Sequence, residues 1–352
     1  MIHSNLNKIY QPVRAAVAML AIIFVLISCN GWTEVESITL NQPNPSESNP
    51  ENYAKYLERL RAYKQSEHYS VYAWFDNSQK EPYSRAHHIS DLPDSIDVVV
   101  MMHPDDLADF ELQEMEALRK NKGTKVVYSI SYDAIRNAYL QMVKDSTEQN
   151  AAYQAPDLDV YINAMVQLEL HPAVNYNYDG IIAGYKGTGV VNKTSAEKDA
   201  YLKSVETFIN AITAWKTANG NKTLDFEGYP QNLVDKTFLT LCKHIILNTL
   251  EATNVDALSF AALQALEEGV PSTAFIVAAP SISIDAADKT TGYYNNGERA
   301  VTESAYWVTE PAATYTKAGL GIYNIRNDYY DPASTYQHTV KAIHIMNPAH
   351  IR

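Results

Sequence analysis

Short apolar runs alternate with amphipathic segments along most of the chain. Eight of the runs have the length of a buried strand, and helical patterns lie between several of them. The expected strands are 70–75, 96–102, 125–131, the end of 175–186, 223–228, 244–248, 273–279 and 319–324. This order predicts parallel strands joined by helical crossovers, and it favours a closed (β/α)8 TIM barrel over an open doubly wound sheet. The stretch 244–250 could also be the end of a helix.

Three helices have clear sequence signals at one end or both. Pro104 begins a helix that runs to about Lys122, and Gly123 stops it. A capping box at 194–197 starts another, and its apolar stripe carries that helix to Gly220. A third covers about 334–346. The segment 51–65 also has helical spacing and predicts a short amphipathic helix at the bottom or side of the domain.

The first thirty residues have the pattern of an export signal. Lys8 and Arg14 precede an apolar run at 15–27, and Leu-Ile-Ser-Cys ends at Cys29. This ending resembles a bacterial lipobox, which implies that Cys29 is acylated. A transmembrane anchor is the alternative, but the run is shorter than the roughly 20 residues that a span needs. We expect a signal peptide at 1–28, a lipidated cysteine and polar tether at 29–52, and one barrel domain at 53–352.

Composition narrows the possible partners. The chain has 352 residues, which suits one barrel with insertions, and its net charge of -13 argues against binding to a nucleic-acid backbone. Cys242 is then the only other cysteine, in an apolar segment typical of a small core residue. His87, His88 and His103 lack metal-ligand spacing, and no phosphate loop is present. We therefore expect no metal and no cofactor.

The stretch 175–186 contains the motif on which the functional interpretation depends. It reads as a buried strand that opens into a glycine-containing loop, with Asp179-Gly180 at its start. Here the chain resembles the family-18 glycoside hydrolases, which are chitinases and endo-β-N-acetylglucosaminidases. Their fourth barrel strand carries Asp-Gly-x-Asp-x-Asp-x-Glu. The three later acids are replaced in this chain by Ile182, Gly184 and Lys186.

The resemblance implies that the catalytic groups are missing. In that family the last Glu is the acid, and the Asp two residues earlier orients the substrate's N-acetyl group as nucleophile. Hydrolysis needs such a proton donor, and Lys186 is not suited to that role. Ser129 matches the family's third strand, but two glycines that follow there are absent, and Asn248 stands near the place of a family Tyr. The chain also resembles Bacteroides-type surface lipoproteins found beside outer-membrane glycan importers.

Binding sites of barrels lie at the carboxyl ends of the strands. Aromatic rings beside amide, carboxylate and guanidinium groups suit sugars, because they offer a flat apolar face together with paired hydrogen bonds. Trp74 is the best single platform, although a buried packing role is equally compatible with the pattern. Residues 293–296 and 328–331 are either further sugar platforms or loop anchors. The ligand-binding candidates are Trp74, Asp76, Tyr132, Tyr185, Lys186, Glu227, Tyr229, Asn248, Tyr323 and Asn324, with His103, Asp133 and Arg326 beside them.

Glu227 supports a different interpretation. It lies two residues from Asp225 on the fifth strand, so both carboxylates would point to one face and could act as acid and base. The alternative is that the pair binds sugar or a partner lysine.

Three hypotheses for function remain at this point. The first is a lipid-anchored, catalytically inactive barrel that captures oligosaccharides containing N-acetylglucosamine or mannose for an outer-membrane uptake system. The second is a divergent active endo-glycosidase that uses Glu227, and the third is an importer-complex scaffold without a sugar site. Exposed aromatic residues at the rim would favour binding over a scaffold, and a buried carboxylate with a raised pKa would favour catalysis.

Overall fold

The computed structural model describes residues 48–187, 194–285 and 287–348. The chain divides into two compact units, 1–53 and 54–352, and the second contains all of the barrel. The predicted signal peptide, Cys29 and most of the tether lie outside the described residues. Within the described part, no helix has the length and apolar character that a membrane crossing requires.

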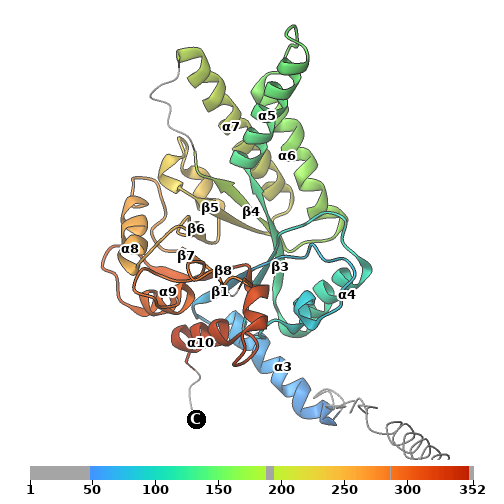
Figure 1. Ribbon diagram of the computed structural model, residues 1–352, viewed down its shortest axis with the longest axis vertical. Helices are drawn as coiled ribbons and strands as arrows, with labels where there is room; N and C mark the ends of the chain where they lie inside the picture. Colours follow the sequence, from blue (N-terminus) through green and yellow to red (C-terminus); the bar gives the residue numbers. More distant parts are fainter. Residues whose placement is uncertain (1–47, 188–193, 286, 349–352) are drawn as a thin grey trace, which may run out of the picture. The chain divides into compact units, whose positions relative to one another are not determined.

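The strands form the closed parallel barrel that the sequence predicts (Figure 1). Each strand pairs with the next along the chain, and the last pairs with the first. The segment 244–250 contributes a strand rather than a helix end. The bounds are β1 (Ser70–Phe75), β2 (Val98–Met101), β3 (Lys125–Ser131), β4 (Gly180–Tyr185), β5 (Thr223–Gly228), β6 (Ile245–Leu247), β7 (Phe275–Pro280) and β8 (Lys317–Tyr323).

Helices surround the barrel. They are α3 (Pro50–Gln65), α4 (Asp109–Ala117), α5 (Tyr132–Gln149), α6 (Leu158–Asn175), α7 (Ser195–Ala218), α8 (Val255–Gln264), α9 (Ala300–Thr309) and α10 (Gln337–Met346). Short turns of helix occur at η1 (Arg85–His87), η2 (Ile89–Asp91), η3 (Leu118–Lys122), η4 (Pro230–Asn232), η5 (Thr237–Leu241) and η6 (Ile325–Tyr330). In Figure 1, α5, α6 and α7 stand together and extend beyond the barrel on one side.

Several helix ends agree with the sequence signals. Thr194 caps α7, and its side chain and that of Glu197 form the predicted reciprocal capping box. Gly123 adopts a left-handed conformation with φ 69° and ends the helical stretch after α4. The start predicted at Pro104 is wrong, because α4 begins at Asp109 and Asp106 has a positive φ of 52°.

The pair α5 and α6 is the main feature of the fold that the pattern does not predict. Helix α5 begins at the residue that follows β3, with no intervening loop. Ser131 makes this possible, since its hydroxyl accepts a hydrogen bond from the backbone N–H of Ala134 at 3.2 Å and caps the helix. Because α5 starts so early, the ring of its first residue, Tyr132, lies in the helical layer rather than at the barrel mouth.

Alternation along the strands divides the core into two parts. One set of side chains packs between the strands and the helices, while the other fills the barrel interior, as expected for strands with period two. The interior set is Tyr72, Trp74, Val98, Val100, Val127, Ile182, Ile246, Ile276 and Ala278. Ile182 is completely buried there, so the first replaced acid position has become part of the hydrophobic core.

Asp179 and Gly180 have a structural role in this chain. The Asp179 carboxylate accepts hydrogen bonds from Arg119 Nε at 2.6 Å and from the backbone N–H of Val126 at 2.9 Å. A Cβ at Gly180 would lie only 2.2 Å from Thr223 Oγ1, so the close approach of β5 requires glycine. Both residues lie at the amino end of β4, and they join the neighbouring strands there rather than facing the mouth of the barrel.

Candidate functional site

A cavity of about 340 Å³ opens at the carboxyl ends of the strands. Five predicted site residues line it, together with several residues that were not predicted to bind ligand. The predicted ones are Trp74, Tyr185, Lys186, Glu227 and Tyr323; the others are Val100, Met101, Met102, Ser129, Ser131, Gly184 and Leu250. The strand register brings them together, since Gly184 on β4 lies opposite Glu227 on β5, and β8 closes against β1.

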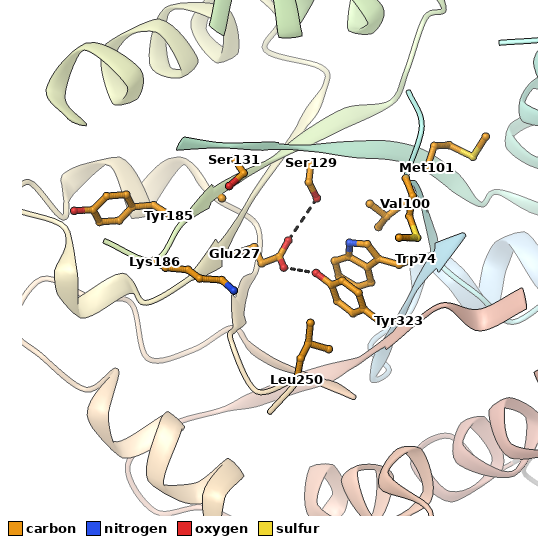
Figure 2. A pocket seen from close by; sticks show the side chains of 12 residues that line it. Trp74, Val100, Met101, Ser129, Ser131, Tyr185, Lys186, Glu227, Leu250 and Tyr323 are labelled. Atoms are coloured by element: carbon orange, nitrogen blue, oxygen red, sulfur yellow. Dashed lines mark hydrogen bonds between the residues drawn. The ribbon is translucent and has the colours of Figure 1, made fainter. Parts of the chain in front are cut away.

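Glu227 is the central polar group of the cavity. Its carboxylate accepts a short hydrogen bond from Tyr323 Oη and a longer one, at 3.4 Å, from Ser129 Oγ. Figure 2 shows these three side chains pointing toward one another. Burial raises the pKa of Glu227 above its usual value, while the hydrogen bond from Tyr323, the charge of Lys186 and the bond from Ser129 oppose that rise.

Trp74 has the packing role that the sequence left open. The side chain is only 3% exposed, and its ring stacks on Tyr323 with centroids 4.1 Å apart and planes 13° from parallel. It therefore supports Tyr323 from inside the barrel and offers little open face to a sugar. Tyr323 in turn positions the carboxylate of Glu227.

Lys186 stands at the rim, exposed to solvent. Its backbone N–H donates to Asp133 Oδ2 at 2.6 Å, and its carbonyl accepts from Asn232 Nδ2 at 2.6 Å. The predicted site residue Asp133 therefore holds Lys186 in place. The Lys186 side chain points into the same space as Glu227 (Figure 2).

Tyr132 does not belong to the site. It is fully buried as the first residue of α5, and its hydroxyl bonds with Ser204 Oγ at 2.7 Å in the helical layer. The Tyr185 ring also points away from the cavity (Figure 2), and its hydroxyl lies 3.0 Å from that of Tyr201. The atoms of Tyr185 that line the cavity are therefore not those of its ring. Both rings were predicted to contact ligand, and both pack against helices instead.

The remaining predicted residues lie outside the lining of the main cavity. Asp76 Oδ2 accepts from Arg326 at 2.7 Å, and His103 Nε2 lies 3.5 Å from Asp76 Oδ1. Burial acts to raise the pKa of Asp76, but hydrogen bonds from Ser78 and the nearby Arg326 charge lower it below its usual value. Asn248 donates to Tyr229 Oη at 2.7 Å, whereas Asn324 is exposed with a left-handed φ of 52°.

Asp225 lies below the cavity and cannot pair with Glu227 as acid and base. It is 1% exposed, and its oxygens accept from Tyr72 Oη at 2.8 Å and from the backbone N–H of His244 at 3.0 Å. Burial raises the pKa of Asp225 to about 6 and lowers that of His244 to about 3. The predicted common face is correct, but the two carboxylates occupy different layers of the barrel interior.

The loop aromatics differ in burial, and the anchoring role predicted as one alternative applies to Tyr294. Tyr294 is buried, and its hydroxyl bonds with Ser304, so it anchors its loop. The guanidinium of Arg299 lies 4.1 Å from the centre of the Tyr293 ring. Tyr330 is 47% exposed beside Tyr329. Tyr293 and Tyr330 line a separate hollow of about 270 Å³. Neither aromatic residue of this hollow lines the main cavity.

One group of possible metal ligands, Asp328, Asp331 and His338, occurs among the described residues. Its contacts fit a helix cap, since Asp328 accepts from the backbone N–H groups of His338 and Thr339, and Asp331 Oδ2 lies 3.1 Å from His338 Nε2. These residues are separate from the lining of the main cavity.

The lining of the main cavity also contains three residues that the sequence did not mark as ligand-binding: Ser131, Met102 and Leu250. Ser131 follows Ser129 by two positions on β3, so strand alternation could have identified it. Met102 is 40% exposed just after β2, and Leu250 lies beyond β6 in an irregular segment. Neither carries a polar signal that would mark a site.

Comparisons with known proteins agree with this fold. The family model described as glycoside hydrolase family 18, BT1044-like, matches residues 33–345. No curated protein matches the chain. The solved structure of BT1044 is 18% identical, with a TM-score of 0.63 over 86% of this chain and 95% of its own.

Two enzymes of known structure share the fold at lower identity. The endo-β-N-acetylglucosaminidase from Cordyceps militaris is 16% identical, with a TM-score of 0.59 over 83% of this chain and 95% of its own. A family-18 chitinase from Chromobacterium violaceum is 13% identical, with a TM-score of 0.51 over 78% and 83%. Because the family model covers most of the sequence, the chain belongs to the BT1044-like group of glycoside hydrolase family 18.

Proposed function

We propose that this chain binds oligosaccharides in the cavity around Glu227 and does not hydrolyse them. The proposal rests on a cavity at the carboxyl ends of the strands that lacks the three acids expected from the family motif. The three positions expected to hold them are Ile182 in the core, Gly184 without a side chain, and Lys186 with an ammonium group. Among the residues lining the cavity, Glu227 is the only carboxylate.

A single carboxylate is insufficient for the usual routes of glycoside hydrolysis. Retaining and inverting enzymes both use a pair of acids beside the scissile bond. The substrate-assisted route implied by the family also needs an acid and an orienting Asp. Asp225 cannot supply the second group, because Tyr72 and the strand backbone enclose it below the cavity.

The ligand class follows from the family and its structural relatives. The Cordyceps militaris relative is an endo-β-N-acetylglucosaminidase, which favours glycans that contain N-acetylglucosamine or mannose. The hydroxyl of Ser129 and the carboxylate of Glu227 provide a donor and acceptors for such a ligand. Purified protein should bind N-glycan oligosaccharides in calorimetry, and Leu250→Trp, which fills the cavity, should remove that binding. Equal binding by the variant would place the ligand elsewhere.

One observation favours a second candidate function. Burial raises the pKa of Glu227, as expected for a general acid, and this supports a divergent endo-glycosidase. Against it, both carboxylate oxygens accept hydrogen bonds from protein hydroxyls. Such bonds stabilise the ionised form, which cannot donate a proton. We therefore rank binding above hydrolysis.

We also propose that the protein is a lipoprotein of the outer membrane that serves a glycan importer. The support is the apolar run at 15–27 that ends in Leu-Ile-Ser-Cys. Cys29→Ala should shift the protein from the membrane fraction to the soluble fraction in cell fractionation, because no acyl chain can then be attached. Cys242→Ala is a matched control, because it removes the other cysteine and leaves the lipobox unchanged. Membrane retention of the Cys29 variant would count against the lipobox.

A further inference from the structure

Lys186 is a cation held in a fixed place at the rim of the cavity. Its backbone is bonded on both sides, to Asp133 on α5 and to Asn232 in η4. These two bonds, each 2.6 Å long, come from separate elements, so the Cα of Lys186 is positioned by the surrounding fold. The residue is exposed, and its side chain points into the cavity (Figure 2).

No described residue uses the bonding capacity of the Lys186 ammonium. The group has three donors, and across residues 48–187, 194–285 and 287–348 its Nζ makes no hydrogen bond or ion pair. Glu227 is the nearby carboxylate, but its two oxygens are already bonded to Tyr323 and Ser129. Lys186 is also the only cation among the lining residues, which are otherwise acidic, apolar or hydroxyl-bearing.

Resting on the proposed glycan-binding function, we propose that Lys186 selects glycans that carry a carboxylate or sulfate group on the sugar that fills the cavity. An ammonium forms charge-assisted hydrogen bonds with such groups, and these are about twice as strong as bonds to a neutral hydroxyl. The sugar ring occupies the floor near Glu227, and the acidic substituent lies toward the rim. The chain's net charge of -13 disfavours anions generally, so a preference for acidic glycans requires a local cation.

A competing role for Lys186 is to offset the charge of Glu227. Its charge does act to lower the pKa of that carboxyl. In that case the lysine would be needed to bind every glycan and would not distinguish acidic glycans from neutral ones. Selectivity between matched glycans therefore separates the two roles.

The test uses an array of glycans in pairs that differ by one acidic group. Suitable pairs are N-acetyllactosamine with and without 6-sulfate, and a biantennary N-glycan with and without terminal sialic acid. The wild-type protein should prefer an acidic member by about tenfold or more. Lys186→Met should reduce that preference to less than about twofold while neutral glycans still bind. Lys186→Arg should keep it, and Lys341→Met on α10 is a control with the same change in charge.

The experiment separates failure of the selective role of Lys186 from failure of glycan binding itself. Wild-type protein that binds neutral and acidic members equally, or Lys186→Met that keeps the preference, would overturn the role of Lys186 and leave glycan binding intact. Wild-type protein that binds no member of any pair would overturn both. A preference confined to the sulfated or to the sialylated pair identifies which acid the rim accepts.

Discussion

Trp74→Ala is expected to cost about 3–5 kcal/mol of unfolding free energy, the usual range for removing a buried tryptophan. The side chain is 3% exposed inside the barrel, and Gly321 leaves the space that its ring occupies. Its loss also removes the surface on which Tyr323 stacks, so Tyr323 and Glu227 lose their fixed positions. Glycan affinity should therefore fall by at least about tenfold even in the folded fraction.

Trp307→Ala provides the matched control for this prediction. Trp307 is also 3% exposed, but it lies on α9 in the outer layer, where Nε1 donates to Ser259. Chemical unfolding and calorimetry at low temperature should show that both variants lose stability, whereas only the Trp74 variant loses affinity. Wild-type affinity in folded Trp74→Ala protein would show that the stack of Trp74 on Tyr323 does not organise the site.

Asp225→Asn should make the protein progressively less stable than the wild type as pH falls from 7 to 4. The folded pKa of Asp225 is about 6, above its usual value of 3.8, because the carboxyl is buried. A raised folded pKa gives stability that is fully present below pH 3.8 and is lost as pH rises through 6. Asparagine cannot take up this proton, so the variant should lose about 2–3 kcal/mol relative to wild type over that range.

His244 has the opposite effect on stability over the same range. Its folded pKa is about 3, so it contributes stability above pH 6.5 that is lost as pH falls toward 3. Between pH 6 and 4, the unfolded wild-type chain carries a proton on His244. The folded protein instead carries a proton on Asp225, so both states bind about the same number of protons. The two effects have opposite signs and largely cancel between pH 6 and 4.

Urea unfolding at several pH values measures this difference directly. The comparison uses the wild type, Asp225→Asn and, as a surface control, Asp145→Asn on the exposed side of α5. Parallel curves for the wild type and the Asp225 variant would contradict the assigned protonation of the Tyr72–Asp225–His244 group. Divergence that grows as pH falls from 7 to 4 is the predicted result.

Strand positions were predictable because barrel strands are short, apolar and alternating. The bounds of β1, β3 and β5 match their predicted ranges, and alternation correctly placed Asp225 and Glu227 on one face. The alternation of side chains along a strand does not show, however, how deep in the barrel a residue lies. The sequence could not show that Asp225 lies one layer lower, enclosed by Tyr72 and His244.

Site residues that depend on helix starts or long-range packing were not predictable. Tyr132 follows a strand, which normally indicates a loop at the barrel mouth, but α5 begins there and buries the ring in the helical layer. The stack of Trp74 on Tyr323 joins the first and last strands, which only barrel closure brings together. The backbone bonds that fix Lys186 come from elements with no recognisable motif.

The most direct test of the central claim is product analysis after prolonged incubation of N-glycan oligosaccharides with the purified protein. Calorimetry on the same samples establishes that the ligand is bound. We expect binding with intact oligosaccharide, and the same result for Glu227→Gln. Release of a shorter glycan by the wild type, abolished in Glu227→Gln, would contradict it and make Glu227 the catalytic acid of a divergent hydrolase.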